Sequence, residues 1–225
     1  MKKSFFIFIM IGLCAATIFA LDLDRLPFSI GGGGNVTGSF STWKVDQDLP
    51  GSLSRYNSNH LSVAPYFFVD LKYVELNLGL PLGFLNADAT MSADPNFPAT
   101  TFALNGGVYL KMPFAVTQTI SIFPLLGIDY DLYLLAKRDD DRDAVFPVST
   151  SKQNAKPIDA LNALWFKAGI GMDSFLTENI FFRTEILYGV RLKNEMEKYL
   201  FDQRSDVDWM IGNGGTFKIA AGYRF

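Results

Sequence analysis

Apolar and polar side chains alternate with a period of two along most of this chain. Successive side chains of a β-strand point to opposite faces, so each alternating segment has one apolar face and one mixed face. The segment around Gly31–Gly34 gives the weakest signal, because glycine carries no side chain. Eight strands are predicted, at about 28–40, 61–69, 74–84, 102–112, 120–134, 164–173, 180–192 and 217–225.

The connections between these segments show a second regularity. Three are short, at 70–72, 115–118 and 177–179, and four are long and polar, at 41–59, 85–98, 137–159 and 194–212. Short and long connections alternate, which places all the long loops at one end of an antiparallel sheet. Short periplasmic turns and long external loops are typical of outer-membrane barrels.

The direction of the apolar face decides between two barrel types. A soluble eight-stranded barrel would place its apolar face inside, but such an interior is only just wide enough for side chains to fill it. The apolar face here carries too many large side chains for that space, whereas the mixed face is rich in glycine. We therefore predict an all-β fold, an eight-stranded antiparallel up-and-down transmembrane β-barrel with its apolar face in lipid.

The N-terminus has the order of a secretory signal peptide. Lys2 and Lys3 precede an apolar run from Phe5 to Phe19, which ends in Ala20. An uncleaved anchor is the alternative, but about 15 apolar residues are fewer than the ~20 that a spanning helix needs. We predict a signal peptide at 1–20, with export of the product, and a barrel domain at 21–225.

Composition excludes several functions. The net charge of −3 comes without a basic stripe, which argues against nucleic acid as a partner. One cysteine and one histidine cannot build a disulfide scaffold or a multi-ligand zinc site, and we expect no cofactor or bound metal. The carboxylates of Asp139–Asp143 lack the spacing of a calcium loop, and His60 with Ser58 is a weak catalytic candidate. We predict that the protein is not an enzyme.

The last nine residues, 217–225, carry the most specific pattern. Aromatic or apolar residues alternate there and the chain ends in phenylalanine. In this respect the sequence resembles the small eight-stranded outer-membrane barrels of bacteria, such as the OmpX, OmpW and OmpA transmembrane-domain types. The resemblance implies a monomer in outer-membrane lipid of a bacterial cell, assembled by the barrel-assembly machinery. The assembly signal would comprise Phe217, Ile219, Tyr223 and Phe225.

The mixed face places charges of both signs inside the barrel. Burying such a charge without a partner costs several kcal/mol of desolvation free energy. A structural salt-bridge network is therefore the favoured interpretation, and an ion or solute path is the alternative. We also name Arg183 and Asp173 as candidate partners. The predicted lumen network comprises Glu75, Lys111, Asp129, Asp131, Lys167, Asp173, Arg183, Glu185, Arg191, Lys193, Lys218 and Arg224.

The sequence supports two functions. The first is surface binding or envelope integrity through the long loops, with extracellular or host ligands as partners. The second, implied by the OmpW type, is a passive channel for small, apolar solutes.

Three prolines lie within predicted strands. Pro65 and Pro81 lie in neighbouring strands and Pro124 lies in the fifth strand, and each proline lacks the N–H that a strand residue donates to its neighbour. We expect each proline to mark a bulge or break. Tolerated bulges that only adjust the curvature of the wall are the favoured interpretation for Pro65 and Pro81, and a lateral gap between strands two and three is the alternative.

Overall fold

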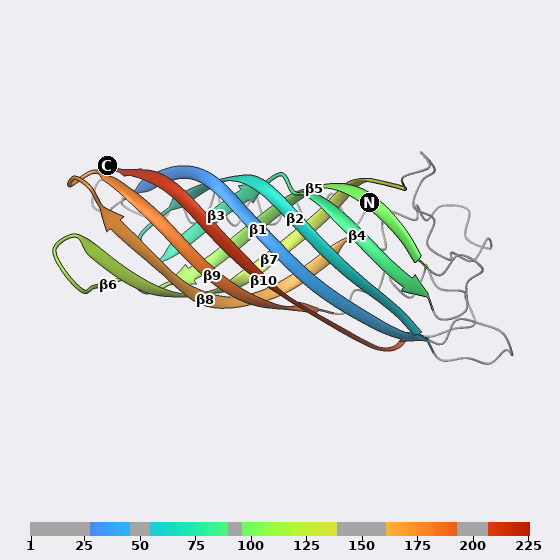
Figure 1. The fold of residues 1–225 in the computed structure, drawn as a ribbon. Coiled ribbons are helices and arrows are strands. Elements are labelled where there is room, and N and C mark those ends of the chain that lie inside the picture. The colour runs from blue at the N-terminus through green and yellow to red at the C-terminus, as the bar shows by residue number, and fades with distance from the viewer. Residues whose placement is uncertain (1–27, 46–54, 90–95, 139–160, 193–206) are drawn as a thin grey trace, which may run out of the picture.

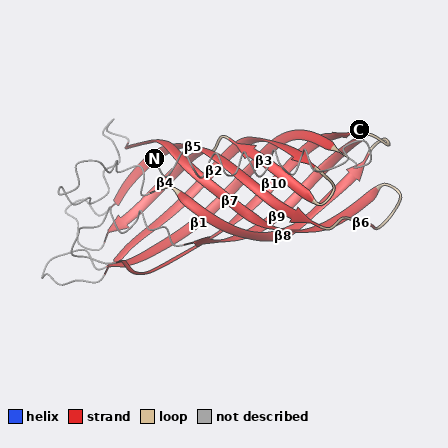
Figure 2. Cartoon of the chain, turned by 180° about the vertical axis from the view of Figure 1, so that it is seen from behind, coloured by secondary structure: helices blue, strands red, loops and turns tan. Residues whose placement is uncertain are grey.

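The computed structural model describes residues 28–45, 55–89, 96–138, 161–192 and 207–225. Within these ranges the chain forms a β-barrel (Figure 1), and the view from behind shows strand all around the wall (Figure 2). No helix of the described part has the length and apolarity of a membrane span. The predicted signal peptide and the Asp139–Asp143 cluster lie outside the described residues.

Ten strand segments form the eight strands of the wall. Leu80 and Pro81 separate β3 from β4, and Met112 and Pro113 separate β5 from β6, yet each pair of segments continues along one line of the wall. The segments are β1 (Ser29–Val45), β2 (Arg55–Asp70), β3 (Val74–Gly79), β4 (Leu82–Ala89), β5 (Asn96–Lys111), β6 (Phe114–Ala115), β7 (Ile120–Arg138), β8 (Ala163–Phe175), β9 (Ile180–Leu192) and β10 (Val207–Arg224).

The barrel closes between its first and last strands. Ser29 of β1 lies opposite Arg224 of β10 on one side and opposite Asp70 of β2 on the other, and every pairing around the wall is antiparallel. Closure pairs β1 with β10, the two strands that would otherwise be the free edges of the described sheet, and a sheet in lipid requires such pairing. The predicted fold class, an eight-stranded antiparallel barrel, is confirmed.

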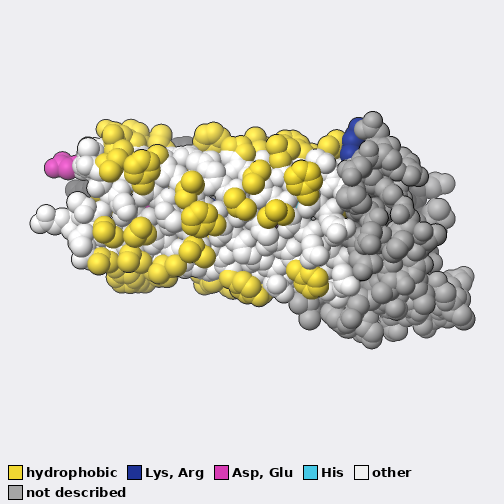
Figure 3. Space-filling view, viewed as in Figure 1, with side chains coloured by type: hydrophobic (Ala, Val, Ile, Leu, Met, Phe, Trp, Pro, Cys, Tyr) yellow, Lys and Arg dark blue, Asp and Glu magenta, His cyan; other side chains and the backbone are white. Residues whose placement is uncertain are grey.

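The outer face of the wall is apolar. Phe67 is 64% exposed and Phe84 is 71% exposed, although both are large apolar side chains. On the face drawn in Figure 3, hydrophobic side chains are spread along the wall, and the visible charged side chains lie at its two ends. An outward apolar band on a closed barrel matches the hydrocarbon core of a bilayer.

Several strands are longer than the sequence predicted. β1 extends to Val45 and β2 begins at Arg55, so much of the loop predicted at 41–59 belongs to the sheet; β10 likewise begins at Val207. The prediction failed because it relied on apolar alternation, whereas strand pairing continues through polar residues. The three short connections lie at the end that holds the C-terminus (Figure 1).

The three prolines differ in their surroundings. Pro81 lies with Leu80 at the break between β3 and β4, as predicted for a proline. Pro65 lies in an unbroken register opposite Leu80, one residue beyond the expected Leu78 or Gly79, and its carbonyl accepts a bond from the Leu80 N–H at 3.1 Å. The Pro81 carbonyl instead accepts a bond from the Ala103 N–H at 3.0 Å, so Pro81 faces β5. The two prolines therefore weaken different seams of the wall, not one. Pro124 does not interrupt β7, because it lies just beyond the end of its ladder with β5.

Candidate functional site

The inner wall holds most of the charged side chains that parity assigned to the lumen. Lys193 lies outside the described residues, and Arg224 lies at the end of β10 with its guanidinium 4.2 Å from the Phe175 ring centre. Asp131 is partly exposed. The buried members are Glu75, Lys111, Asp129, Lys167, Asp173, Arg183, Glu185, Arg191 and Lys218.

Arg183 is the centre of the largest group. It lies on β9 directly opposite Asp173 of β8, and its Nε and Nη2 donate to the two carboxylate oxygens at 2.7 and 2.8 Å. This two-point contact is the strongest geometry that arginine and a carboxylate adopt. Nη1 also donates to Glu75 at 2.8 Å, and Nη2 to Asp70 at 2.8 Å. One guanidinium thus joins carboxylates from three strands.

Two lysines extend this group. The Lys111 ammonium donates to Asp70. The Lys218 ammonium lies 3.1 Å from a Glu185 oxygen and 3.9 Å from a Glu75 oxygen. We call the whole set the Arg183 cluster; it comprises Asp70, Glu75, Lys111, Asp173, Arg183, Glu185 and Lys218.

A collar of aromatic rings encloses the guanidinium. The ring centres of Phe68, Phe123 and Phe181 lie 4.3, 5.1 and 5.1 Å from its central carbon. Glycines on adjacent strands provide the room for these rings, because an added Cβ would come within 2.2–2.4 Å of a ring atom. These glycines are Gly31 beside Phe68, Gly171 beside Phe123 and Gly222 beside Phe181.

This half of the barrel is filled. Arg183 is 1% exposed and Glu75 and Glu185 are 0% exposed, in the middle of what would be a pore. Tyr66, Tyr109 and Leu187 fill the remaining space around them, and all three are fully buried. An eight-stranded wall leaves little free bore, and here side chains occupy it.

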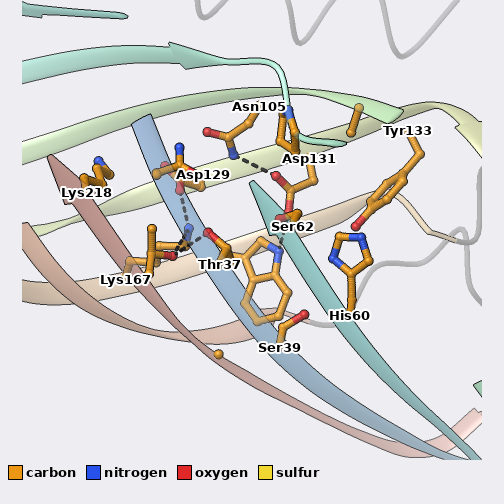
Figure 4. A pocket seen from close by; sticks show the side chains of 16 residues that line it. Thr37, Ser39, His60, Ser62, Asn105, Asp129, Asp131, Tyr133, Lys167 and Lys218 are labelled. Carbon is orange, nitrogen blue, oxygen red and sulfur yellow. Dashed lines mark hydrogen bonds and ion pairs between the residues drawn. The ribbon is translucent and has the colours of Figure 1, made fainter. Parts of the chain in front are cut away.

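A cavity lies in the lumen beyond the Arg183 cluster (Figure 4). The Asp131 carboxylate accepts hydrogen bonds from Asn105 at 2.7 Å and from the Trp165 indole at 2.8 Å. The Lys167 ammonium lies 2.5 Å from Asp129. The full lining of this lumen cavity is Asn35, Thr37, Ser39, His60, Ser62, Pro81, Ala103, Asn105, Asp129, Asp131, Tyr133, Trp165, Lys167, Gly214, Thr216 and Lys218.

His60 also lines this cavity but does not form catalytic geometry with Ser58. Its Nε2 lies 2.8 Å from the Thr101 hydroxyl, and its ring meets Tyr133 edge-on at 5.7 Å between centres. No group of three or more His, Cys, Asp or Glu side chains in the described part is arranged for a metal ion. These contacts give His60 a packing role in the wall of the cavity.

Sequence reasoning missed Asp70, which it assigned to a turn. Asp70 is the last residue of β2 and is 5% exposed, and it pairs with both Arg183 and Lys111. A signal was present, because Asp70 has the same parity as the inward-facing Tyr66 and Phe68. The residues of the proposed assembly signal lie on the other face: Phe217, Ile219, Tyr223 and Phe225 are 45%, 54%, 44% and 66% exposed.

A closed eight-stranded barrel with an apolar outer face and a charged interior, filled in part by side chains, defines a class of protein. It is an integral β-barrel protein of the bacterial outer membrane. No protein-family model matches the chain. No curated protein sequence matches it either.

Solved structures resemble the barrel at low identity. The outer membrane protein OprG from Pseudomonas aeruginosa has a TM-score of 0.48 at 13% identity, covering 89% of this chain and 96% of that one. The outer membrane protease OmpT from Escherichia coli has a TM-score of 0.41 at 8% identity, covering 91% and 98%. Ail, the attachment invasion locus protein of Yersinia pestis, has a TM-score of 0.30 at 13% identity, covering 87% and 99%. Because all three TM-scores are below 0.5, the class rests on the geometry of the barrel itself.

Proposed function

We propose that this barrel is a non-enzymatic, non-conducting outer-membrane protein that acts in surface binding and envelope integrity. The observation that carries the proposal is the filled half of the lumen. The Arg183 cluster and its collar of Phe68, Phe123 and Phe181 occupy the bore at the end that holds the short turns. A solute crossing there would have to separate buried ion pairs, at a cost of several kcal/mol.

Planar-bilayer conductance tests this proposal. Purified barrel, with its folding verified by heat-modifiable migration on gels, should give no conductance steps above those of the detergent control. A screen for binding to extracellular and host ligands accompanies it. A matched variant, in which a short Gly-Ser link replaces 139–160, should remain folded and lose any binding found. Reproducible conductance steps from the unaltered barrel would contradict the proposal.

The same proposal includes the partners of assembly. The wall closes on itself through β1 and β10, which supports a monomer in outer-membrane lipid. The outward side chains of Phe217, Ile219, Tyr223 and Phe225 would present the signal to the barrel-assembly machinery. The Phe225 N–H also donates to the Phe28 carbonyl at 2.9 Å, which ties the last residue to the start of β1.

A second candidate function is a lateral route for small apolar solutes from the lumen cavity into lipid. Two neighbouring strand pairs, β2 with β3–β4 and β3–β4 with β5, each lack one hydrogen bond. Proline has no N–H, so Pro65 cannot donate to Leu80 and Pro81 cannot donate to Ala103. The next seam has a register shift at Phe102 and Ala103. Since Pro81 and Ala103 line the lumen cavity, these defects lie in its wall.

Uptake into proteoliposomes tests this second function. A lateral route predicts slower uptake of a small apolar solute by the Pro65→Val, Pro81→Val double variant, because valine restores both donors. Pro124→Val is the matched control, since Pro124 is exposed on a different part of the wall. Equal uptake by all three proteins, or none by any, would exclude the lateral route and leave the surface role.

A further inference from the structure

The Arg183 cluster carries more negative than positive charge. Its three cations, Lys111, Arg183 and Lys218, face four carboxylates. The adjoining ion pair of Lys167 with Asp129 adds one charge of each sign, so it leaves this difference unchanged. A buried charge without a counter-charge is strongly unfavourable. The cluster therefore requires one more positive charge than its own side chains supply.

Two of the four carboxylates have strong cation contacts of their own. Asp173 accepts two hydrogen bonds from the guanidinium of Arg183, at 2.7 and 2.8 Å. Asp70 accepts from the Lys111 ammonium and, at 2.8 Å, from the same guanidinium. The missing positive charge is therefore a property of the other two carboxylates, which are the glutamates of the cluster.

These glutamates, Glu75 on β3 and Glu185 on β9, share the same two cations. Lys218 Nζ lies 3.9 Å from a Glu75 oxygen and 3.1 Å from a Glu185 oxygen. Arg183 Nη1 donates to Glu75 at 2.8 Å, and Arg183 Nε lies 3.9 Å from a Glu185 oxygen. The two carboxyl groups are fully buried and lie within hydrogen-bonding reach of each other.

Contact between two carboxyl groups requires a proton. An ionised carboxylate only accepts hydrogen bonds, so two of them in contact repel each other, whereas a protonated carboxyl group donates to its neighbour. Among the described residues, neither oxygen of Glu185 has a hydrogen-bond partner. Glu75 accepts from Arg183 and, at 3.5 Å, from the Asn77 amide. One proton between the two glutamates provides the missing hydrogen bond and brings the cluster to neutrality.

We propose that the Arg183 cluster binds one proton, shared between the Glu75 and Glu185 carboxyl groups, and that this proton makes the stability of the barrel depend on pH. The other groups around the pair do not replace it: two are neutral phenols, one is a neutral amide, two are carboxylates and three are the cations already counted. They are Tyr66 and Asp70 of β2, Asn77 of β3, Tyr109 and Lys111 of β5, Asp173 of β8, Arg183 of β9 and Lys218 of β10.

The shared proton gives the pH dependence a definite sign. In the unfolded chain the glutamates are in water and ionise at about pH 4.3. Above that pH the folded barrel binds one proton more than the unfolded chain, so its stability falls as the pH rises. The folding equilibrium constant falls about tenfold per pH unit until the folded pair itself ionises. Loss of the proton then leaves two negative charges in contact within the filled half of the lumen.

Infrared spectroscopy of the barrel folded in lipid vesicles tests for the proton directly, because a protonated carboxyl group absorbs apart from ionised carboxylates. At about pH 6, exposed carboxyl groups are ionised. The unaltered barrel should show the band of a buried protonated carboxyl group. Glu75→Gln and Glu185→Gln should each remove it, because the remaining glutamate then has both shared cations to itself. Glu178→Gln, on an exposed turn, is the matched control and should retain the band.

Urea unfolding between about pH 5 and about pH 7 tests the consequence for stability. The unaltered barrel is compared with Glu75→Gln at each pH, so that the titration of groups common to both proteins, such as His60, cancels. The folding equilibrium constant of the unaltered barrel, relative to that of the variant, should fall about tenfold per pH unit. The ratio of the unaltered barrel to Glu178→Gln should not change with pH.

Three outcomes would overturn the proposal. The first is an unaltered, folded barrel that shows no band of a protonated carboxyl group. The second is a band that persists in both Glu75→Gln and Glu185→Gln, which would place the proton on a different carboxyl group. The third is an equal pH dependence of stability in the unaltered barrel and in Glu75→Gln. None of these outcomes bears on conductance or surface binding, so this proposal and the proposed function fail independently.

Discussion

Replacement of Arg183 by alanine should strongly destabilise the barrel. The substitution removes four hydrogen bonds of 2.7–2.8 Å and leaves Asp173, Glu75 and Asp70 without their shared cation. Loss of one partner from a buried ion pair costs about 3–5 kcal/mol, chiefly because a buried charge remains uncompensated. With a urea slope of about 2 kcal/mol per molar, the unfolding midpoint should fall by about 1.5–2.5 M.

Urea unfolding in lipid vesicles, followed by tryptophan fluorescence and by heat-modifiable migration, measures this shift. Lys152→Ala, which alters a residue of the predicted loop 137–159, is the control and should change the midpoint negligibly. Arg183→Lys should give an intermediate loss, because lysine keeps the charge and cannot contact Asp173 with two nitrogens. Equal, negligible shifts for Arg183→Ala and Lys152→Ala would refute the structural role of the Arg183 cluster.

Two further predictions concern assembly and packing. Deletion of Phe225 should lower the amount of folded protein in the outer membrane, because the last residue bonds to the start of β1; unchanged heat-modifiable migration and surface exposure would count against this. Gly171→Ala should destabilise the barrel by about 1–3 kcal/mol, because its Cβ would lie 2.2 Å from the buried Phe123 ring. Gly106→Ala is the matched control, with nothing within 4 Å of its added Cβ, and a urea midpoint lowered equally by both would contradict the packing argument.

Parity, together with the alternation of short and long connections, predicted the fold and the two faces of the wall. The reason is that a strand in this barrel meets two very different surroundings, lipid outside and a narrow charged lumen inside. Leu187 shows the limit of the rule, since it is apolar yet 1% exposed and faces inward beside Tyr109. Leu187 faces inward because it shares the odd-numbered positions of β9 with Arg183 and Glu185, and not because it is hydrophobic. Alternation was therefore more informative than the character of single residues.

The register between strands could not be predicted from the sequence. The ion-pair partners inside the lumen depend on that register, so most of them could not be predicted either. Arg183 and Asp173 were nameable because one tight turn joins their strands, at Leu176–Asn179. The contact of Arg183 with Glu75 joins residues 108 positions apart, across the barrel, and no local pattern encodes it. The strand ends could not be predicted either, because strand hydrogen bonds continue into polar segments that lack apolar alternation, as in β1 and β10.

The charged interior also has a consequence for the specificity of the fold. A one-residue slip of any strand would exchange its inner and outer faces. If both faces were apolar, such a slip would cost little; here it would move a buried ion of the Arg183 cluster into lipid and leave its partners unpaired, at several kcal/mol for each ion. Lys218 on β10 and Arg183 on β9 thereby oppose slippage of the last two strands, of which β10 closes the barrel against β1. We infer that the Arg183 cluster selects a single register as well as closing the bore. Arg183→Met with Glu75→Gln and Asp173→Asn, which removes three of its charges, should then give barrels of mixed register by hydrogen exchange even where they remain stable.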